Sequence, residues 1–269
     1  EALAVCADKI ARRGVTRQRL IATQACRAAE NGEDFLERVR AETGLALEVI
    51  ATEEEARLAV RGCAELIDEG AAASLIFDIG GGSTELVFVA RGANAGEPPL
   101  IKGFGSIPLG VVTLAERFGT HEISNAVYPQ MLMAAHQAFA EGGLPGVADL
   151  GLDLGAMHLL GTSGTVTTVA GIHLGLQRYE RAKVDGQWLP VASALSVSRR
   201  LTSLPYDKRL TEPCIGRDRA DLVMSGCAIF ETIATLWPCA DLRVADRGLR
   251  EGMLLALMES ADKEDEAGA

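Results

Sequence analysis

A glycine-rich segment with an acidic residue at each end is the part of this sequence best suited to chemistry. It begins at Asp78 and ends at Glu85, and the residues that can contact an anion are Gly80, Gly81, Gly82, Ser83 and Thr84. Three consecutive residues without Cβ let backbone N–H groups approach an anion closely and form a nest. Two carboxylates beside a phosphate-sized nest are typical of a divalent cation that bridges to phosphate oxygens. The alternative is an ordinary hairpin with glycine at a bulge.

The residues on either side of this segment predict strands. Residues 74–79 form a short apolar run that ends in Asp78 and Ile79, and residues 86–90 form a second apolar, β-branched run. A glycine turn between two strands excludes a P-loop and a dinucleotide fingerprint, because both need a helix after the glycines. The sequence therefore predicts a β-hairpin with an anion site at its tip.

A second glycine loop connects a predicted strand at 157–160 to a predicted helix at 166–176. Its residues are Gly161, Thr162, Ser163, Gly164 and Thr165. The start of a helix offers free N–H groups and the positive end of the helix dipole to an anion. The alternative is that Thr165 is simply the N-cap of the helix. Together the two loops predict two anion-binding edges that face one cleft.

Two further residues have both a chemical and a structural interpretation. Glu55 could orient and deprotonate a water molecule, or it could only close a capping box with Thr52. Arg27 follows the end of a predicted strand, where α/β sheets place ligand contacts, and its planar guanidinium suits phosphate oxygens. The alternative for Arg27 is a solvated surface position.

Composition limits the class of protein. The chain has 269 residues, 48% of them hydrophobic, a net charge of −11 and a pI near 4.9. This acidity disfavours nucleic acid as a partner, and no apolar run is long enough to span a membrane. The six cysteines and four histidines show no metal-binding spacing, so we expect a reducing cytoplasm and neither zinc nor cysteine chemistry.

The predicted elements alternate between helices and strands. Strands at 19–23 and 46–50 enclose a helix at 34–43, which predicts a βαβ unit. Helices are also predicted at 1–13, 52–68, 111–118, 131–140, 192–203, 219–236 and 251–259, with strands at 102–109 and 242–245 and an irregular stretch at 177–190. This alternation, with one clear hairpin, predicts an α/β fold with a mixed sheet.

These motifs together resemble the exopolyphosphatase/guanosine pentaphosphate phosphohydrolase family, within the actin-like, sugar-kinase-like ATPase superfamily. The glycine hairpin alone would indicate only the superfamily. The family is indicated by T-E-E-E-A-R-L from Thr52, A-D-R-G-L-R-E-G from Ala245 and R-A-D-L-V from Arg219, together with the segments around Arg27, Ile107 and Gly161.

The resemblance implies two ribonuclease-H-like domains with mixed sheets. Residues 1–53 would be the remainder of an N-terminal domain that lacks its first strands in this chain, and residues 54–249 would be the C-terminal domain. Residues 250–269 would form a helix that packs back on the N-terminal domain, followed by an acidic tail. The family's first phosphate loop, Asp-x-Gly-(Ser/Thr)-Asn-Ser, does not occur in these residues and is expected upstream. A homodimer is implied by the family alone.

The resemblance also assigns roles to residues. Glu55 would be catalytic, Asp78 and Glu85 would hold Mg²⁺ or alternatively Mn²⁺, and Arg27 would contact the phosphate chain. Residues 80–84 would be the second phosphate loop. A Val-His-Gly stretch of the family is replaced here by Val184-Asp185-Gly186.

The expected activity is metal-assisted hydrolysis of the terminal phosphoanhydride of inorganic polyphosphate. The alternatives are hydrolysis of guanosine pentaphosphate to ppGpp, a phosphotransferase of the sugar-kinase type, and a non-catalytic sensor that binds polyphosphate or an alarmone.

Overall fold

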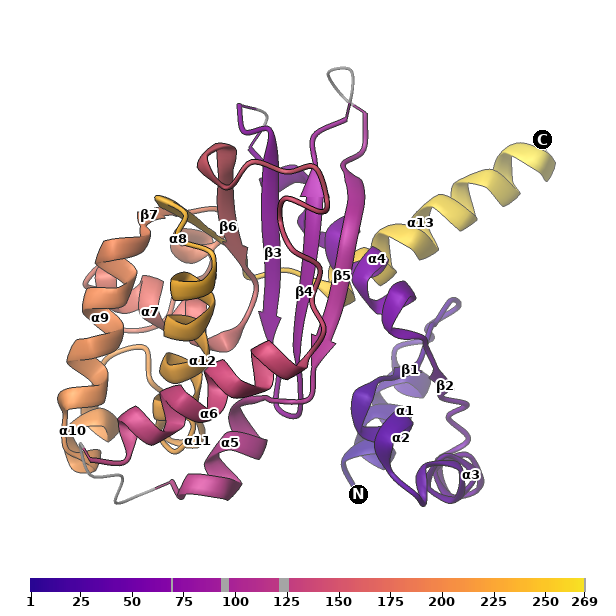
Figure 1. Cartoon of the computed structure of the whole chain (residues 1–269). Coiled ribbons are helices and arrows are strands. Elements are labelled where there is room, and N and C mark those ends of the chain that lie inside the picture. Colours follow the sequence, from indigo (N-terminus) through magenta and orange to yellow (C-terminus); the bar gives the residue numbers. More distant parts are fainter. Residues whose placement is uncertain (69, 93–96, 121–125, 269) are drawn as a thin grey trace. The chain divides into compact units, whose positions relative to one another are not determined.

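The computed structural model of the chain describes residues 1–68, 70–92, 97–120 and 126–268 (Figure 1). Internal contacts divide the chain into two compact units, a smaller one of Glu1–Gly62 with Leu249–Ala269 and a larger one of Cys63–Gly248. Both units combine helices with a sheet, and the larger sheet is mixed, so the predicted α/β class is confirmed. The domain limits that the sequence predicts after residues 53 and 249 stay predictions. The two units group residues by their internal contacts, which is a different criterion from the limits of a domain.

The smaller unit contains a βαβ arrangement. Strand β1 (Ile21–Ala22) pairs in parallel with β2 (Glu48–Val49), as the sequence predicted. The helices of this unit are α1 (Ala2–Arg12), α2 (Gln24–Ala28), α3 (Gly32–Thr43), α4 (Thr52–Cys63, whose last residue belongs to the larger unit) and α13 (Leu249–Gly268). Helix α3 is capped at its C-terminus by Gly44, whose left-handed backbone (φ 72°) favours glycine.

Helix α13 packs closely on α4. A Cβ added at Gly252 would lie 1.9 Å from the carbonyl oxygen of Leu58, so the two helices approach as closely as glycine allows. Arg61 of α4 also forms an ion pair with Glu259 of α13. Helix α13 continues to Gly268, so the acidic tail is helical.

The larger unit is built on a six-stranded mixed sheet with the order β5-β4-β3-β6-β8-β7. Strands β3 and β6, and β6 and β8, are parallel, whereas the other neighbouring pairs are antiparallel. The strands are β3 (Ala73–Ile79), β4 (Thr84–Ala90), β5 (Leu100–Ile107), β6 (Met157–Gly161), β7 (Trp188–Pro190) and β8 (Asp241–Val244).

Helix α12 is the centre of the helical layer in this unit and contacts α5, α6, α7, α9 and β3 (Figure 1). The helices are α5 (Val111–Phe118), α6 (Tyr128–Glu141), α7 (Gly164–His173), α8 (Arg181–Val184), α9 (Val191–Ser203), α10 (Tyr206–Thr211), α11 (Arg217–Ala220) and α12 (Val223–Leu236). Two short 3-10 helices cover Ala64–Leu66 and Leu154–Ala156. Across the described residues, every helix is too short or too polar to cross a lipid bilayer.

The main core fills the space between the sheet and α12. Leu75, Phe77 and Ile79 of β3 join it, and the ring of Phe77 stacks on that of Phe230 with centroids 6.2 Å apart. Alternate residues of a strand point to opposite faces of a sheet, so Asp78 lies on the face away from this core. The buried face of β3 thus fixes the direction in which Asp78 points.

The structure differs from the sequence-based assignment in several places. The stretch 177–190 was predicted to be irregular, but it contains α8 and the edge strand β7, which exists because it pairs with β8 and buries Leu189. The single helix predicted at 219–236 is interrupted near Leu222, where α11 ends and α12 begins, and no glycine or proline marks the break. Helices α2 and α10 were not predicted.

Truncation of Phe230 tests how far the core secures β3. We expect Phe230→Ala to lower the free energy of unfolding by about 3–5 kcal/mol, because it removes a fully buried ring and leaves a cavity beside Phe77. Urea denaturation measures the effect. Met133→Ala is the control, because Met133 is 66% exposed and the loss of its side chain should cost less than about 0.5 kcal/mol. Equal costs for the two variants would contradict this account of the core.

Candidate functional site

The predicted glycine hairpin is present. Strands β3 and β4 are joined by the turn 80–83, which is closed by a hydrogen bond of 2.9 Å from the N–H of Gly80 to the carbonyl oxygen of Ser83. None of Gly80, Gly81 and Gly82 has a left-handed backbone. Conformational freedom therefore does not explain why these three residues are glycine.

Gly82 has no packing reason to be glycine. A Cβ added at Gly80 would lie 3.0 Å from the oxygen of Ser83, and one at Gly81 would lie 3.5 Å from Val112. A Cβ at Gly82 would meet nothing within 4 Å. The absence of a side chain at Gly82 leaves open space at the tip of the hairpin, which is what the approach of a ligand requires.

The two acidic residues of the hairpin lie directly opposite each other. Asp78 pairs with Glu85 in the register of β3 and β4, so their Cβ atoms are about 4.5–5.5 Å apart on one face. Like charges at this spacing repel each other, and a bound cation relieves that repulsion. The hydroxyl groups of Ser83 and Ser106 donate hydrogen bonds to Oε1 of Glu85 at 2.5 and 3.0 Å and hold that carboxylate in place.

This pair suits a magnesium site only if the substrate completes it. In the described residues, no group of three or more His, Cys, Asp or Glu side chains is arranged to hold a metal ion. Mg²⁺ usually binds one or two carboxylates and keeps waters or phosphate oxygens as its other ligands. The donor set of Asp78 and Glu85 therefore fits Mg²⁺ bound together with phosphate.

The second glycine loop leads into α7, as predicted, but its cap is a different residue. Ser163 is the N-cap, and its Oγ accepts a hydrogen bond of 3.2 Å from the N–H of Val166, so the alternative of a cap at Thr165 is wrong. Gly161 has a packing explanation, since a Cβ there would lie 2.6 Å from the ring of Phe77. The first N–H groups of α7, at Gly164 and Thr165, point out of the helix start, where an anion could accept from them.

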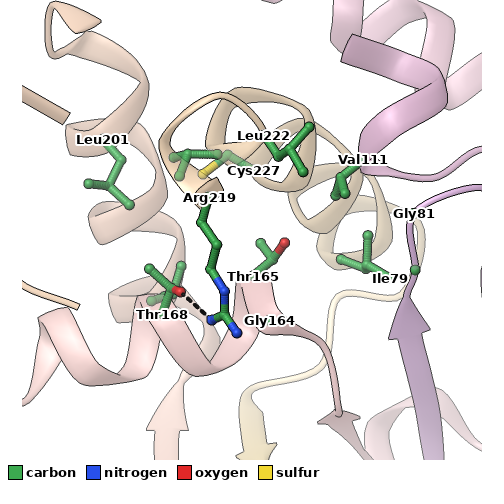
Figure 2. Close-up of a pocket in the computed structure, with 13 residues that line it drawn as sticks. Ile79, Gly81, Val111, Gly164, Thr165, Thr168, Leu201, Arg219, Leu222 and Cys227 are labelled. Atoms are coloured by element: carbon green, nitrogen blue, oxygen red, sulfur yellow. Dashed lines mark hydrogen bonds between the residues drawn. The ribbon is translucent and has the colours of Figure 1, made fainter. Parts of the chain in front are cut away.

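Both glycine loops line one pocket of about 210 Å³ in the larger unit (Figure 2). Gly80 and Gly81 border it on one side, and Gly164 and Thr165 border it on another. The remaining walls are mostly apolar and are formed by Ile79, Val111, Val169, Leu201, Leu222, Val223 and Cys227, with the polar Thr168 and Arg219. The two loops line a common cavity, but Asp78 and Glu85 do not line it, because they lie on the face of the hairpin away from α12. The anion-binding and metal-binding roles predicted for these residues stay predictions.

Arg219 is a pocket residue that the sequence analysis did not single out. It is the one charged side chain among the pocket-lining residues, all of which lie in the described part of the chain. Its Nη1 donates to Oγ1 of Thr168 at 3.4 Å, and its Cζ would lie 3.4 Å from a Cβ at Gly164 (Figure 2). The guanidinium therefore lies at the N-terminus of α7. The available signal was the R-A-D-L-V motif, which was noted without a role for its arginine.

Cys227 is unsuited to nucleophilic chemistry although it lines the pocket. Burial raises the pKa of its thiol to about 11, so the thiol stays protonated at neutral pH.

Glu55 and Arg27 form an ion pair within the smaller unit. Oε2 of Glu55 accepts a hydrogen bond of 2.8 Å from Nη2 of Arg27, and both side chains are largely buried. Helix α4 begins at Thr52, and the carbonyl of Ala51 accepts its first hydrogen bond, from the N–H of Glu55. Ala51 is therefore the N-cap, and the capping-box alternative for Glu55 is wrong. The alternative of a solvated Arg27 is wrong as well.

Most hydrogen-bond donors of Arg27 are already used. Its Nη1 donates to the carbonyl of Ile50 at 2.6 Å, and its Nε and Nη2 contact Oε1 of Gln24 at 3.4 and 3.2 Å. With the bond to Glu55, one of its five N–H hydrogens remains. Arg27 is thus placed to orient Glu55, and its predicted contact with a phosphate chain stays a prediction.

A second charged cluster lies at the carboxyl end of β8. Asp246 accepts a hydrogen bond of 2.5 Å from the hydroxyl of Tyr179, and Asp185 forms an ion pair of 2.6 Å with Arg247 and accepts from the N–H of Asp246 at 2.9 Å. Burial alone would raise the pKa of Asp185, but the hydrogen bonds from Arg247 and Asp246 outweigh burial and lower that pKa. Asp185 thereby ties the 177–190 stretch to the end of β8.

Comparison with known proteins identifies the family. Residues 1–261 match the model of the Ppx/GppA phosphatase family. The chain belongs to this family.

Relatives and solved structures agree with the assignment. The chain is 30% identical to exopolyphosphatase 2 of Mycobacterium tuberculosis over 223 residues, which are 81% of this chain and 66% of that protein. Among solved structures it is similar to an exopolyphosphatase-like protein (TM-score 0.81, 27% identity, 94% of this chain and 81% of the other). It is also similar to the Aquifex aeolicus Ppx/GppA family member (TM-score 0.75, 28% identity, 97% and 80%). These similarities confirm the predicted family and its actin-like two-domain fold.

The Asp185–Arg247 pair gives a pH-dependent prediction. Because the pKa of Asp185 is lowered in the folded protein, its contribution to stability is present above the unfolded pKa, near 3.9, and is lost as the pH falls through the folded value. We expect Asp185→Asn to lower the free energy of unfolding by about 1 kcal/mol at pH 7, and by progressively less below pH 4. Chemical denaturation at several pH values measures both effects.

Glu65 provides the matched control for this prediction. It also forms an ion pair with Arg247, at 3.0 Å, but its side chain is 83% exposed. Glu65→Gln should therefore change the free energy of unfolding by less than about 0.5 kcal/mol both at pH 7 and below pH 4. A pH-independent loss in Asp185→Asn would mean that packing, and not charge, explains the role of Asp185.

Proposed function

We propose that this protein hydrolyses the terminal phosphoanhydride of inorganic polyphosphate and releases orthophosphate. The observation that carries the proposal is the pocket bordered by Gly80 and Gly81 on one side and by Gly164 and Thr165 on another. Backbone N–H groups and a helix N-terminus that border one cavity favour a phosphate ligand. Membership of the Ppx/GppA phosphatase family and the exopolyphosphatase relatives from M. tuberculosis support this substrate. Because the chain spans slightly less than two thirds of those relatives, their activity is carried over as a proposal.

The glycine loops supply the binding of the substrate in this proposal. Residues 80–84 hold the terminal phosphate through backbone N–H groups, and the loop from Gly161 to Thr165 holds a neighbouring phosphate at the start of α7. Arg219 adds a cation at that helix start, where its guanidinium can pair with phosphate oxygens. Such local positive groups are needed because the whole chain carries a net charge of −11.

Asp78 and Glu85 would hold Mg²⁺, or Mn²⁺ in its place. A divalent cation at this pair would neutralise charge on the phosphate oxygens. Ser83 and Ser106 keep the Glu85 carboxylate oriented toward one side through their hydrogen bonds to Oε1. The repulsion between the two opposed carboxylates provides the physical reason for a cation there.

Glu55 is the proposed general base. Its carboxylate is held by Arg27 through Oε2, and within the described residues Oε1 accepts no hydrogen bond, so Oε1 can accept the proton of a water molecule. The oxygen of that water attacks the terminal phosphorus, and the bridging P–O bond breaks. The products are orthophosphate and a chain one phosphate shorter, and no covalent intermediate is required. Catalysis of this kind depends on positioning and on stabilisation of charge.

Replacement of the base tests the catalytic role directly. In the full-length protein, Glu55→Gln should lower kcat for phosphate release by at least about 100-fold, because the amide cannot accept the proton, and should leave polyphosphate binding nearly unchanged. Phosphate-release kinetics and calorimetric titration with polyphosphate measure the two quantities. Glu54→Gln is the control, since Glu54 neighbours Glu55 but pairs with Arg19 at 3.1 Å. Wild-type rates in Glu55→Gln would reject the proposed role.

The open space at the hairpin tip gives a second test. Gly82→Ala should leave the free energy of unfolding within about 0.5 kcal/mol of wild type, because the added methyl group meets no protein atom. It should weaken polyphosphate binding at least about tenfold, because the methyl group would occupy the path of the phosphate to the N–H groups. Thermal melts and titrations separate these outcomes. Unchanged binding would remove the hairpin tip from the substrate site.

The apolar walls of the pocket favour guanosine pentaphosphate as a second candidate substrate. A phosphate chain has no apolar part, whereas Leu201, Leu222 and Val223 could pack against a purine base. Both substrates end in a phosphoanhydride, so the same loops and Glu55 would act on each. Parallel phosphate-release assays on polyphosphate and guanosine pentaphosphate decide between them. Binding of either without any phosphate release would instead indicate a sensor, and transfer from ATP to a hydroxyl acceptor would indicate a kinase.

A reducing cytoplasmic location and a homodimer complete the proposal. All six cysteines are free, as expected for a protein that folds in a reducing compartment. The homodimer rests on the family resemblance, and measurement of the molar mass in solution tests it.

A further inference from the structure

The N-terminus of α5 is bonded to the glycine turn. The N–H of Val111 donates to the carbonyl oxygen of Gly80, and the N–H of Val112 donates to that of Gly81, both at 2.9 Å. The first N–H groups of a helix have no acceptors within the helix. In α5 they find those acceptors on the turn, so two successive carbonyl groups of the turn point at the helix.

This arrangement determines where the N–H groups of the turn point. A trans peptide is planar, with its C=O and N–H directed to opposite sides, and the described residues contain no cis peptide bond. Because the carbonyls of Gly80 and Gly81 point at α5, the N–H groups of Gly81 and Gly82 point away from it. Within the described residues, neither of these N–H groups has a hydrogen-bond acceptor. Both N–H groups are therefore available to donate to an anion on the side of the turn away from α5.

Gly110 makes the contact possible. It is the N-cap of α5, and its φ of −128° and ψ of −179° are open to any residue, so conformation does not explain the glycine. A Cβ at Gly110 would lie 2.3 Å from the carbonyl oxygen of Gly81 and 2.6 Å from that of Gly80. Distances this short require the turn or the helix to move.

Thr113 holds Gly110 in place from within α5. Its Oγ1 accepts a hydrogen bond of 2.9 Å from the N–H of Gly110 and donates one of 3.1 Å to the carbonyl oxygen of Gly110. Gly110 is thereby fixed to the first turn of α5 on both sides of its backbone. The bonds that hold α5 to the glycine turn are those from Val111 and Val112.

We propose that Gly110 is a positioning residue for the phosphate site, and this inference rests on the proposed function. By lacking a side chain, Gly110 lets α5 hold the carbonyls of Gly80 and Gly81, and so aims the N–H groups of Gly81 and Gly82 at the terminal phosphate. The positive end of the α5 dipole then acts on the phosphate through the turn. Gly110 itself touches no substrate.

The test uses the full-length protein labelled with ¹⁵N-glycine, with tripolyphosphate and Mg²⁺ as the probe. In the wild type, titration should shift the amide resonances of Gly81, Gly82 and Gly164. In Gly110→Ala, the shifts of Gly81 and Gly82 should be lost or reduced at least about threefold, while that of Gly164 persists. The dissociation constant of tripolyphosphate should rise at least about tenfold. A purely structural role would not remove the response of one loop and keep that of the other.

Two further variants keep the inference testable if Gly110→Ala does not fold. Thr113→Val removes both hydrogen bonds to Gly110 with little change in size, and it should weaken tripolyphosphate binding as Gly110→Ala does. Thr113→Ser keeps a hydroxyl group at this position and should bind tripolyphosphate as tightly as the wild type. Gly216→Ala is the control, because Gly216 is also a helix N-cap but a Cβ there meets nothing within 4 Å. Gly216→Ala should leave the amide shifts of Gly81 and Gly82 and the affinity for tripolyphosphate unchanged.

The outcomes separate this inference from the proposed function. If tripolyphosphate shifts the Gly81 and Gly82 amides equally in the wild type, Gly110→Ala and Thr113→Val, the positioning role is wrong and the phosphate site stands. If tripolyphosphate shifts neither glycine loop of the wild type, the phosphate site itself is wrong.

Discussion

The peptide group is planar, and this constraint underlies the binding surface of the glycine hairpin. Fixing a carbonyl fixes the next N–H in the opposite direction. Helix α5 fixes the carbonyls of Gly80 and Gly81, so the donors at Gly81 and Gly82 point away from it without any left-handed residue in the turn. Two glycines with different tasks are therefore needed. Gly110 admits the helix to the turn, and Gly82 leaves space for a ligand.

The second loop is placed by strand pairing and by packing, because Gly161 of β6 pairs with Phe77 of β3 and the N–H of Thr162 donates to the carbonyl oxygen of Phe77 at 2.9 Å. Gly161 ends β6 against the ring of Phe77, and that ring stacks on Phe230 of α12. Helix α12 in turn approaches the start of α7, since a Cβ at Gly226 would lie 2.2 Å from Oγ1 of Thr165. The core thus connects β3 to α12 and α12 to the N-terminus of α7. The two loops line one pocket because the same helix packs against both supporting elements.

The charge on the lining of the pocket differs in sign from the net charge of the chain. The chain carries a net charge of −11, yet the pocket contains Arg219 and no carboxylate among its lining residues. The opposed Asp78 and Glu85 lie on the same face of the hairpin, where their repulsion favours a cation. In the smaller unit, Arg27 neutralises Glu55 and also restrains its orientation. Among the acidic groups with a proposed role, Glu55 is thus compensated by Arg27, and Asp78 and Glu85 are paired across the hairpin where a cation could bind.

The sequence by itself determined the features that depend on local pattern. Alternating apolar runs and glycine spacing gave the hairpin, the parallel pair β1–β2 and α5 with its observed limits, and the motifs gave the family. Only the tertiary structure revealed β7, the partner of Glu55, and the roles open to Arg219 and Gly110. Edge-strand pairing and ion pairs join residues that are distant in sequence, so local periodicity carries no trace of them. A glycine required by the approach of another segment has the same appearance in a sequence as a glycine required by a turn.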